Sequence, residues 1–259
     1  MKNIINWKLY MVLLSVSIIA IIAVLPYAFT LAGDVVKQVP FSLSIFILIT
    51  IIQSSILFAI VLFFGLILSK KVGLGLPIIE DFLSKKNARP DIKSIVKTSA
   101  LIGVAVGIAI ILTDLLFAKL GGSISLWSGQ MPPAWMGFFA SFYGGINEEI
   151  LLRLFFMTFL IWLFSKFKKA DVNILNNNPI MWSAIIIATV IFGLGHLPIT
   201  GSVTDLTPLV VIRAIVLNGI GGIIFGWLYW KKGLESAIIA HFSADIVLHT
   251  IFPSLLFLI

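Results

Sequence analysis

An acidic pair, Glu148-Glu149, lies in the middle of an apolar segment that runs from Ala134 to Phe164. Each ionisable side chain at the centre of such a segment disfavours membrane insertion by about 2.5–3.5 kcal/mol, so these side chains are expected to be paired or used. Glu149 and Arg153 have the four-residue spacing at which an acid and a base meet on one helix face. Glu148 points about 100° away around a helix, which leaves it free to face a cavity.

Two histidines in later apolar segments extend this set. His196 follows Phe192 by four residues, and His241 precedes Asp245 by four residues. A carboxylate one turn away can orient an imidazole and fix its tautomer. A shared site of Glu148, His196 and His241 suits hydrolysis of a carbonyl compound, although helix Glu/Arg pairs and single buried histidines can also be purely structural.

Two routes to hydrolysis remain open from these residue types. Glu148 can act as a general base on water with a histidine assisting, which requires no cofactor and is the interpretation we prefer. Alternatively, Glu148, His196 and His241 are candidate ligands for a divalent metal such as Zn²⁺, whose bound water would attack. The sequence contains neither a His-Glu-x-x-His zinc motif nor a Gly-x-Ser-x-Gly nucleophile motif.

The composition places this site in a membrane. The chain has 259 residues, of which 60% are hydrophobic and only 11% charged, and its mean hydropathy is +1.13. These values predict a single polytopic membrane domain over residues 1–259 whose partner is the lipid bilayer. The absence of cysteine excludes disulfides, thiolate metal sites and a cysteine nucleophile.

The net charge of +7 does not indicate nucleic-acid binding, because the basic residues gather in short segments between apolar runs. That pattern is typical of cytoplasmic loops. It predicts a multi-pass protein of the cell membrane with its N-terminus and the loops at 69–97, 165–179 and 231–233 in the cytoplasm.

The apolar runs predict an all-α bundle of seven to eight transmembrane helices around an intramembrane polar cavity. The count depends on whether Pro253 ends a helix. We expect an amphipathic piece over 76–83, a polar loop over 197–208 and a bend at Gly144-Gly145. The predicted spans are Leu9–Leu31, Ser42–Leu68, Thr98–Ala118, Ala134–Phe164, Ile180–His196, Leu209–Trp230 and Leu234 to the C-terminus.

The three motifs together resemble a known family. Glu148-Glu149-x-x-x-Arg153, Phe192-x-x-x-His196 and His241-x-x-x-Asp245, in this order and all in apolar segments, are similar to the motif set of the CPBP (Abi) intramembrane proteases. These include the type II CAAX prenyl endopeptidases of the Ras-converting type. The resemblance covers about residues 134–259 and implies that they form the catalytic core, with residues 1–130 as more variable N-terminal helices.

The resemblance implies an intramembrane endopeptidase that cleaves a peptide bond near the C-terminus of a prenylated (CAAX-type) or other membrane-associated peptide. Glu148 would activate water with help from His196, while His241 and Asp245 would stabilise the oxyanion. Glu149, Arg153 and Phe192 would support them. The family's prenyl proteases often have Asn at the last position, and an ionised Asp245 cannot donate a hydrogen bond, so Asp245 must be protonated or must orient His241 instead. Descriptions of the family as metalloproteases keep the metal route open.

Two rival functions follow from other features. A non-proteolytic immunity or scaffold protein would have the same fold without the chemistry. A transporter would use Glu148 and Arg153 in an ion path, with Arg213 and Asn218 as the further polar residues that suit it best. The sequence indicates neither the oligomeric state nor the natural substrate.

Overall fold

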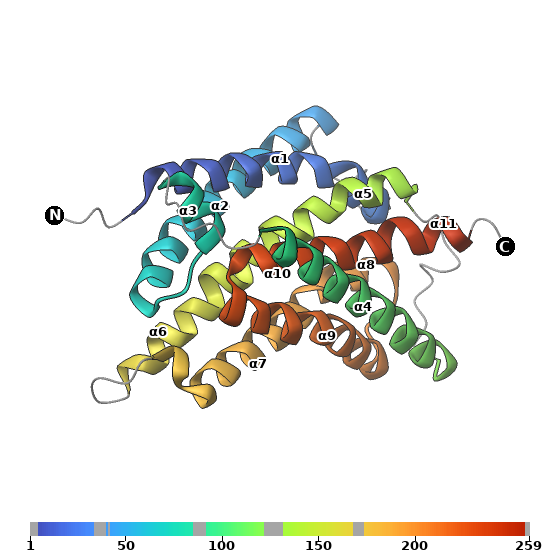
Figure 1. The fold of residues 1–259 in the computed structure, drawn as a ribbon. Helices are drawn as coiled ribbons and strands as arrows, with labels where there is room; N and C mark the ends of the chain where they lie inside the picture. The colour runs from blue at the N-terminus through green and yellow to red at the C-terminus, as the bar shows by residue number, and fades with distance from the viewer. Residues whose placement is uncertain are drawn as a thin grey trace.

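A computed structural model describes residues 5–33, 40, 42–84, 92–121, 132–167 and 174–256. All regular structure in these ranges is helical, which confirms the predicted all-α membrane fold (Figure 1). The basic residues at 85–91 and 168–173, the connection at 34–39 and Trp127 lie outside the described residues. The long helices are α1 (Trp7–Ala32), α2 (Leu43–Val72), α4 (Ile92–Lys119), α7 (Asn178–Gly195), α9 (Pro208–Lys232) and α10 (Leu234–Asp245); the shorter ones are α3 (Pro77–Leu83), α5 (Ala134–Phe142), α6 (Thr158–Lys166), α8 (Leu197–Val203) and α11 (Phe252–Leu256).

Six helical runs within the described residues are long and apolar enough to cross a membrane. A further run, from Ala134 to Lys166, is continuous but changes from α to π geometry at its centre, as η3 (Tyr143–Glu148) and η4 (Ile150–Met157). The last run continues from α10 through the π-helix η6 (Ile246–Ile251) into α11, so Pro253 does not end it. The described part of this multi-pass membrane protein thus contains six such runs, in addition to the continuous run from Ala134 to Lys166.

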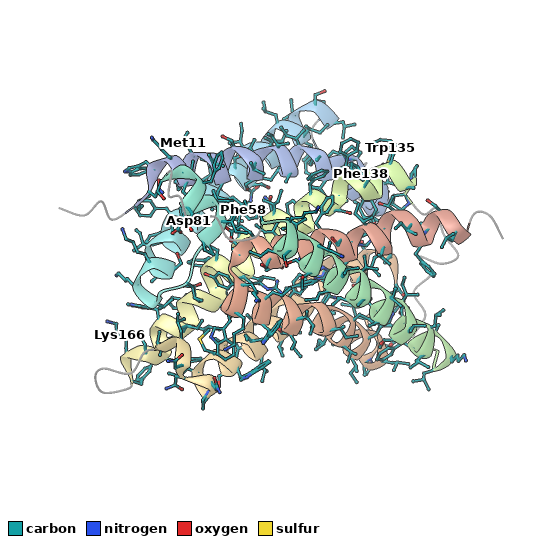
Figure 2. The ribbon with its side chains drawn as sticks, in the orientation of Figure 1. Met11, Phe58, Asp81, Trp135, Phe138 and Lys166 are labelled. Atoms are coloured by element: carbon teal, nitrogen blue, oxygen red, sulfur yellow. The ribbon has the colours of Figure 1, made fainter. Side chains whose placement is uncertain are left out.

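The outer surface is apolar, as a lipid-facing surface requires. Met11 on α1 and Trp135 and Phe138 on α5 project from the outside of the molecule, with exposed fractions of 56%, 53% and 41%, whereas Phe58 on α2 is 1% exposed and lies in the core (Figure 2).

Helix α10 lies at the centre of the fold, packed against α4, α9, α5 and η3 (Figure 1). Small residues permit this close packing. A Cβ added at Gly103 or Gly107 of α4 would collide with the backbone or side chains of α10 and η6. A Cβ at Gly145 would meet Phe242 at 2.8 Å. Gly145 is therefore explained by close helix approach rather than by the bend we expected.

The start of α10 is tied to the short helix α3, where the amphipathic piece was predicted. The Ile79 amide donates to Glu235 Oε1 at 2.9 Å, and the Leu234 amide donates to Gly75 O at 3.0 Å. Gly233, with φ of +96°, makes the turn between α9 and α10, a conformation that favours glycine. These contacts set where α10 begins.

The predicted polar loop over 197–208 is wrong in its first half, because Leu197–Val203 forms helix α8. Pro198 lies in the first turn of α8, where a residue without an N–H costs nothing. The next helix, α9, begins at Pro208 with the Thr207 hydroxyl accepting from the Val210 amide. His196 thus lies at the junction of α7 and α8.

Candidate active site

A cavity of about 400 Å³ opens between α1, α4, α8, α9 and the central helices. Four predicted catalytic residues line it: Glu148, His196, His241 and Asp245. Phe192 also lines it, whereas Glu149 and Arg153 lie behind its wall with exposed fractions of 0% and 2%. The structure therefore brings all the predicted site residues into one place, while their catalytic roles stay predictions.

The predicted ion pair between Glu149 and Arg153 is confirmed, with Glu149 Oε1 3.0 Å from Arg153 Nη1. Arg153 also donates from Nη2 to Gly222 O at 3.2 Å. Its guanidinium lies over the rings of Phe192 and Phe225, at 5.2 and 5.7 Å from their centroids, in cation–π contact. A buried arginine held on so many sides fixes the position of Glu149 behind the cavity wall.

Glu148 takes the opposite direction, as its place in the helix predicted. Its side chain keeps 24% of its surface accessible in the cavity, and its Oε2 lies 3.7 Å from His241 Nε2. The π geometry on both sides of the acidic pair was not predicted; π segments are rare and occur mainly at functional sites. The Thr158 hydroxyl and amide both bond to Arg153 O, which satisfies a carbonyl freed by the wider helix.

His241 has carboxylates at both ring nitrogens. Its Nδ1 is 2.8 Å from Glu149 Oε1, and its Nε2 is 3.6 Å from Asp245 Oδ1. The orienting carboxylate is therefore Glu149 from the neighbouring helix. Asp245 makes no hydrogen bond to His241, because its oxygen is beyond hydrogen-bonding distance, so the role of Asp245 stays a prediction. The Phe225 ring stacks on the imidazole at 4.6 Å and excludes other orientations.

His196 is oriented through its own helix. Its Nδ1 is 2.9 Å from Phe192 O; because a carbonyl only accepts, Nδ1 carries the proton and Nε2 is an acceptor in the neutral ring. The Phe192 ring meets His196 and His241 edge-on, at centroid distances of 4.7 and 5.9 Å. Phe192 thus packs against both imidazoles, which gives its supporting role a geometric basis.

The same geometry bears on whether Glu148, His196 and His241 could bind a metal ion. Within the described ranges, no three His, Asp or Glu side chains form a group that could hold a metal ion. Glu148 and His241 face each other, but His196 does not join them as a third ligand in this arrangement. We therefore derive no step through a metal ion.

Sequence reasoning missed two polar contacts at this cavity. Arg213 of α9 pairs with Asp114 of α4 through two bonds, Nε–Oδ1 at 2.6 Å and Nη2–Oδ2 at 2.7 Å. Tyr27 of α1 contacts the third histidine, His249, with Oη 3.0 Å from Nδ1. A charge in an apolar span and a histidine four residues after Asp245 were available signals. Asn218, the other polar residue noted on α9, donates to Ala214 O of its own helix.

The comparisons with known proteins bear on the same segment. Residues 130–247 match the family model described as type II CAAX prenyl endopeptidase Rce1-like. No curated protein and no solved structure matched the chain. The matched segment contains the acidic pair, both cavity histidines and Asp245, in a family of protease-type enzymes. By this match, residues 130–247 are similar to the type II CAAX prenyl endopeptidase Rce1-like family.

Proposed function

We propose that the protein is an intramembrane endopeptidase that hydrolyses a peptide bond near the C-terminus of a prenylated or other membrane-associated peptide. The observation that carries this proposal is the convergence of Glu148, His196 and His241 on one cavity inside a helical bundle. The family match makes a peptide the expected substrate. The mostly apolar lining suits a peptide that carries a lipid.

In this mechanism Glu148 is the general base. A water molecule within reach of its carboxylate loses a proton to Glu148 while the water oxygen attacks the carbonyl carbon of the substrate. His196 Nε2, which is an acceptor when Nδ1 donates to Phe192 O, holds the other proton of that water. Two acceptors on one water orient its remaining lone pair toward the carbonyl carbon.

His241 supplies the oxyanion donor. Because Nδ1–H donates to Glu149, a doubly protonated ring presents Nε2–H beside Glu148, where the carbonyl oxygen becomes negative. Glu148 then passes its proton to the leaving amine as the carbon–nitrogen bond breaks, which yields a carboxylic acid and an amine. Asp245 cannot donate when ionised, so the donor role falls to His241 alone.

The test is cleavage of a farnesylated C-terminal peptide by the purified protein, read by mass spectrometry with and without a chelator. We expect cleavage that persists with chelator, and loss of at least about 100-fold in each of Glu148→Ala, His196→Ala and His241→Ala. Full activity in any one folded variant would defeat the mechanism. Loss of activity on chelation would favour the metal route.

Failure of the wild-type protein to cleave this peptide, and its unprenylated and otherwise lipidated analogues, would favour the non-proteolytic alternative. An undiminished phenotype in cells that carry Glu148→Ala would support the same conclusion.

A further inference from the structure

A second row of polar side chains, Tyr27, His249 and Asp245, leads from helix α1 to the site. Tyr27 Oη is 3.0 Å from His249 Nδ1, and the two rings meet edge-on with centroids 5.5 Å apart. His249 Nε2 is 3.9 Å from Asp245 Oδ1, the same oxygen that lies 3.6 Å from His241 Nε2. Tyr27, Asp245 and His249 all line the cavity.

We propose that Tyr27 and His249 are positioning residues: Tyr27 orients the Nε2–H of His249 toward Asp245 Oδ1, and this attraction helps to keep the carboxylate in place. Neither lies in the matched segment 130–247, and the mechanism above uses neither. The proposal rests on the proposed function for its catalytic consequence. The contacts between Tyr27, His249 and Asp245 can be tested without any substrate.

Donor and acceptor rules decide which way the hydrogen bond between Tyr27 and His249 runs. If His249 Nδ1 donated to Tyr27, the lone pair of Nε2 would face an ionised Asp245, which is repulsive. If the Tyr27 hydroxyl donates to Nδ1, the proton of a neutral ring sits on Nε2 and points toward Asp245 Oδ1. The tyrosine hydroxyl therefore selects the histidine tautomer that attracts the carboxylate.

Asp245 is held on its other oxygen by close packing. A Cβ at Gly144 would collide with Asp245 Oδ2 and would lie 3.4 Å from His241 Nε2. With Oδ2 against the Gly144 backbone, the carboxylate holds Oδ1 3.6 Å from His241 Nε2 and 3.9 Å from His249 Nε2, beyond hydrogen-bonding distance of both rings. His241 Nε2–H then remains available for the oxyanion instead of being spent on Asp245.

In this arrangement Asp245 has a role that suits a carboxylate better than the side-chain amide of an asparagine. An ionised carboxylate attracts the Nε2–H of His249 across 3.9 Å and provides a negative charge near His241 without forming a hydrogen bond to it. Loss of the Tyr27 hydroxyl would release the His249 tautomer and allow Asp245 to bond directly to His241. The expected consequence is a fall in kcat with little change in KM, because substrate binding is not involved.

The structural test uses the full-length protein labelled with ¹⁵N-histidine, because the chain has only three histidines. In the wild-type protein we expect the ring nitrogens of His249 to report the neutral Nε2–H tautomer. Tyr27→Phe should shift the ring resonances of both His249 and His241 and leave those of His196 in place. His241 resonances that stay unchanged in both Tyr27→Phe and His249→Gln would overturn the proposal.

Tyr10→Phe is the matched control, since Tyr10 lies on the same helix and donates to Ala59 O at 3.1 Å, away from the cavity. It should shift none of the three histidines; a shift of His241 there would show that any loosening of α1 suffices, against the proposal.

The kinetic arm measures cleavage of the farnesylated peptide. Tyr27→Phe should lower kcat by about 10- to 100-fold, the usual cost of removing a group that orients a reactive residue. His249→Gln retains an N–H donor and should keep more activity than His249→Leu. An unchanged kcat in Tyr27→Phe would contradict the proposal. Shifted His241 resonances in a wild-type protein that cleaves nothing would leave the anchoring intact and defeat only the proposed function.

Discussion

Two buried arginines lie near the cavity, Arg213 in its lining and Arg153 behind it, and their surroundings differ. Arg213 and Asp114 form a two-bond pair that joins α9 to α4. Arg153 shares only one short contact with Glu149 Oε1, and that same oxygen accepts from His241 Nδ1. The Arg213 pair involves no further charged partner among these contacts, whereas Glu149 of the Arg153 pair also contacts the His241 imidazole.

This difference separates a structural use of buried charge from a functional one. Replacement of both members of a buried ion pair by apolar residues is often neutral for stability, whereas removal of one member costs about 3–5 kcal/mol. If the two pairs play different roles, the apolar replacement should be harmless at α4–α9 and damaging at Glu149–Arg153. The Arg213–Asp114 pair also weakens the transporter alternative, since the charge of Arg213 is already neutralised by Asp114.

The largest effect is expected from the double variant Glu149→Leu/Arg153→Met. The fold should persist, because no uncompensated charge remains buried, but His241 loses the acceptor at Nδ1. Peptide cleavage should fall by about 100-fold or more. The measurement is kcat together with the unfolding temperature in detergent, and a stable variant with wild-type kcat would show that Glu149 does not orient His241.

Asp114→Ala is expected to lower stability strongly and to change the rate of peptide cleavage little. Arg213 is left unpaired in the wall, which lowers the free energy of unfolding by about 3–5 kcal/mol. The folded fraction should cleave peptide within about threefold of the wild-type rate, as measured after correction for folded protein by binding of a conformation-dependent dye.

The double variant Asp114→Leu/Arg213→Met is the matched counterpart and should recover most of the lost stability. Should it retain stability yet lose cleavage 100-fold, the Arg213 pair would belong to the chemistry and the contrast between the two pairs would fail.

A smaller effect is expected from Gly144→Ala, because its Cβ collides with the Asp245 carboxylate. Overpacking of this kind costs about 1–3 kcal/mol, and displacement of Asp245 toward His241 should lower kcat by about tenfold. Gly195→Ala is the control: nothing lies within 4 Å of its Cβ, although it precedes His196 directly. It should change stability by at most about 1 kcal/mol and leave kcat unchanged; equal losses in both variants would remove the case for tight packing at Asp245.

Local spacing predicted some contacts and not others. The Glu149–Arg153 pair and the divergence of Glu148 follow from helical geometry within a few residues. The bond between His241 and Glu149 joins positions 92 apart, and that between Arg213 and Asp114 joins positions 99 apart. No spacing rule within one helix reaches such pairs, so Asp245 was taken as the partner of His241 merely because it is one turn away.

The fold was predicted with similar limits. Hydropathy identified the membrane runs, because apolar length is a direct physical requirement for crossing a bilayer. The π segments around Glu148 were missed, since a search for 3.6-residue periodicity assumes the α geometry that they depart from. Helix α8 was missed because proline usually indicates the end of a helix, whereas Pro198 lies in the first turn of a new one.

The cavity has walls from α1 and α4, which lie outside the segment that matches the family. Anyone seeking a minimal version of this protein should therefore not trim it to residues 130–247. In such a fragment the cavity would lack the wall that α1 and α4 provide, and lipid tails could enter at the positions that Tyr27 and Asp114 occupy.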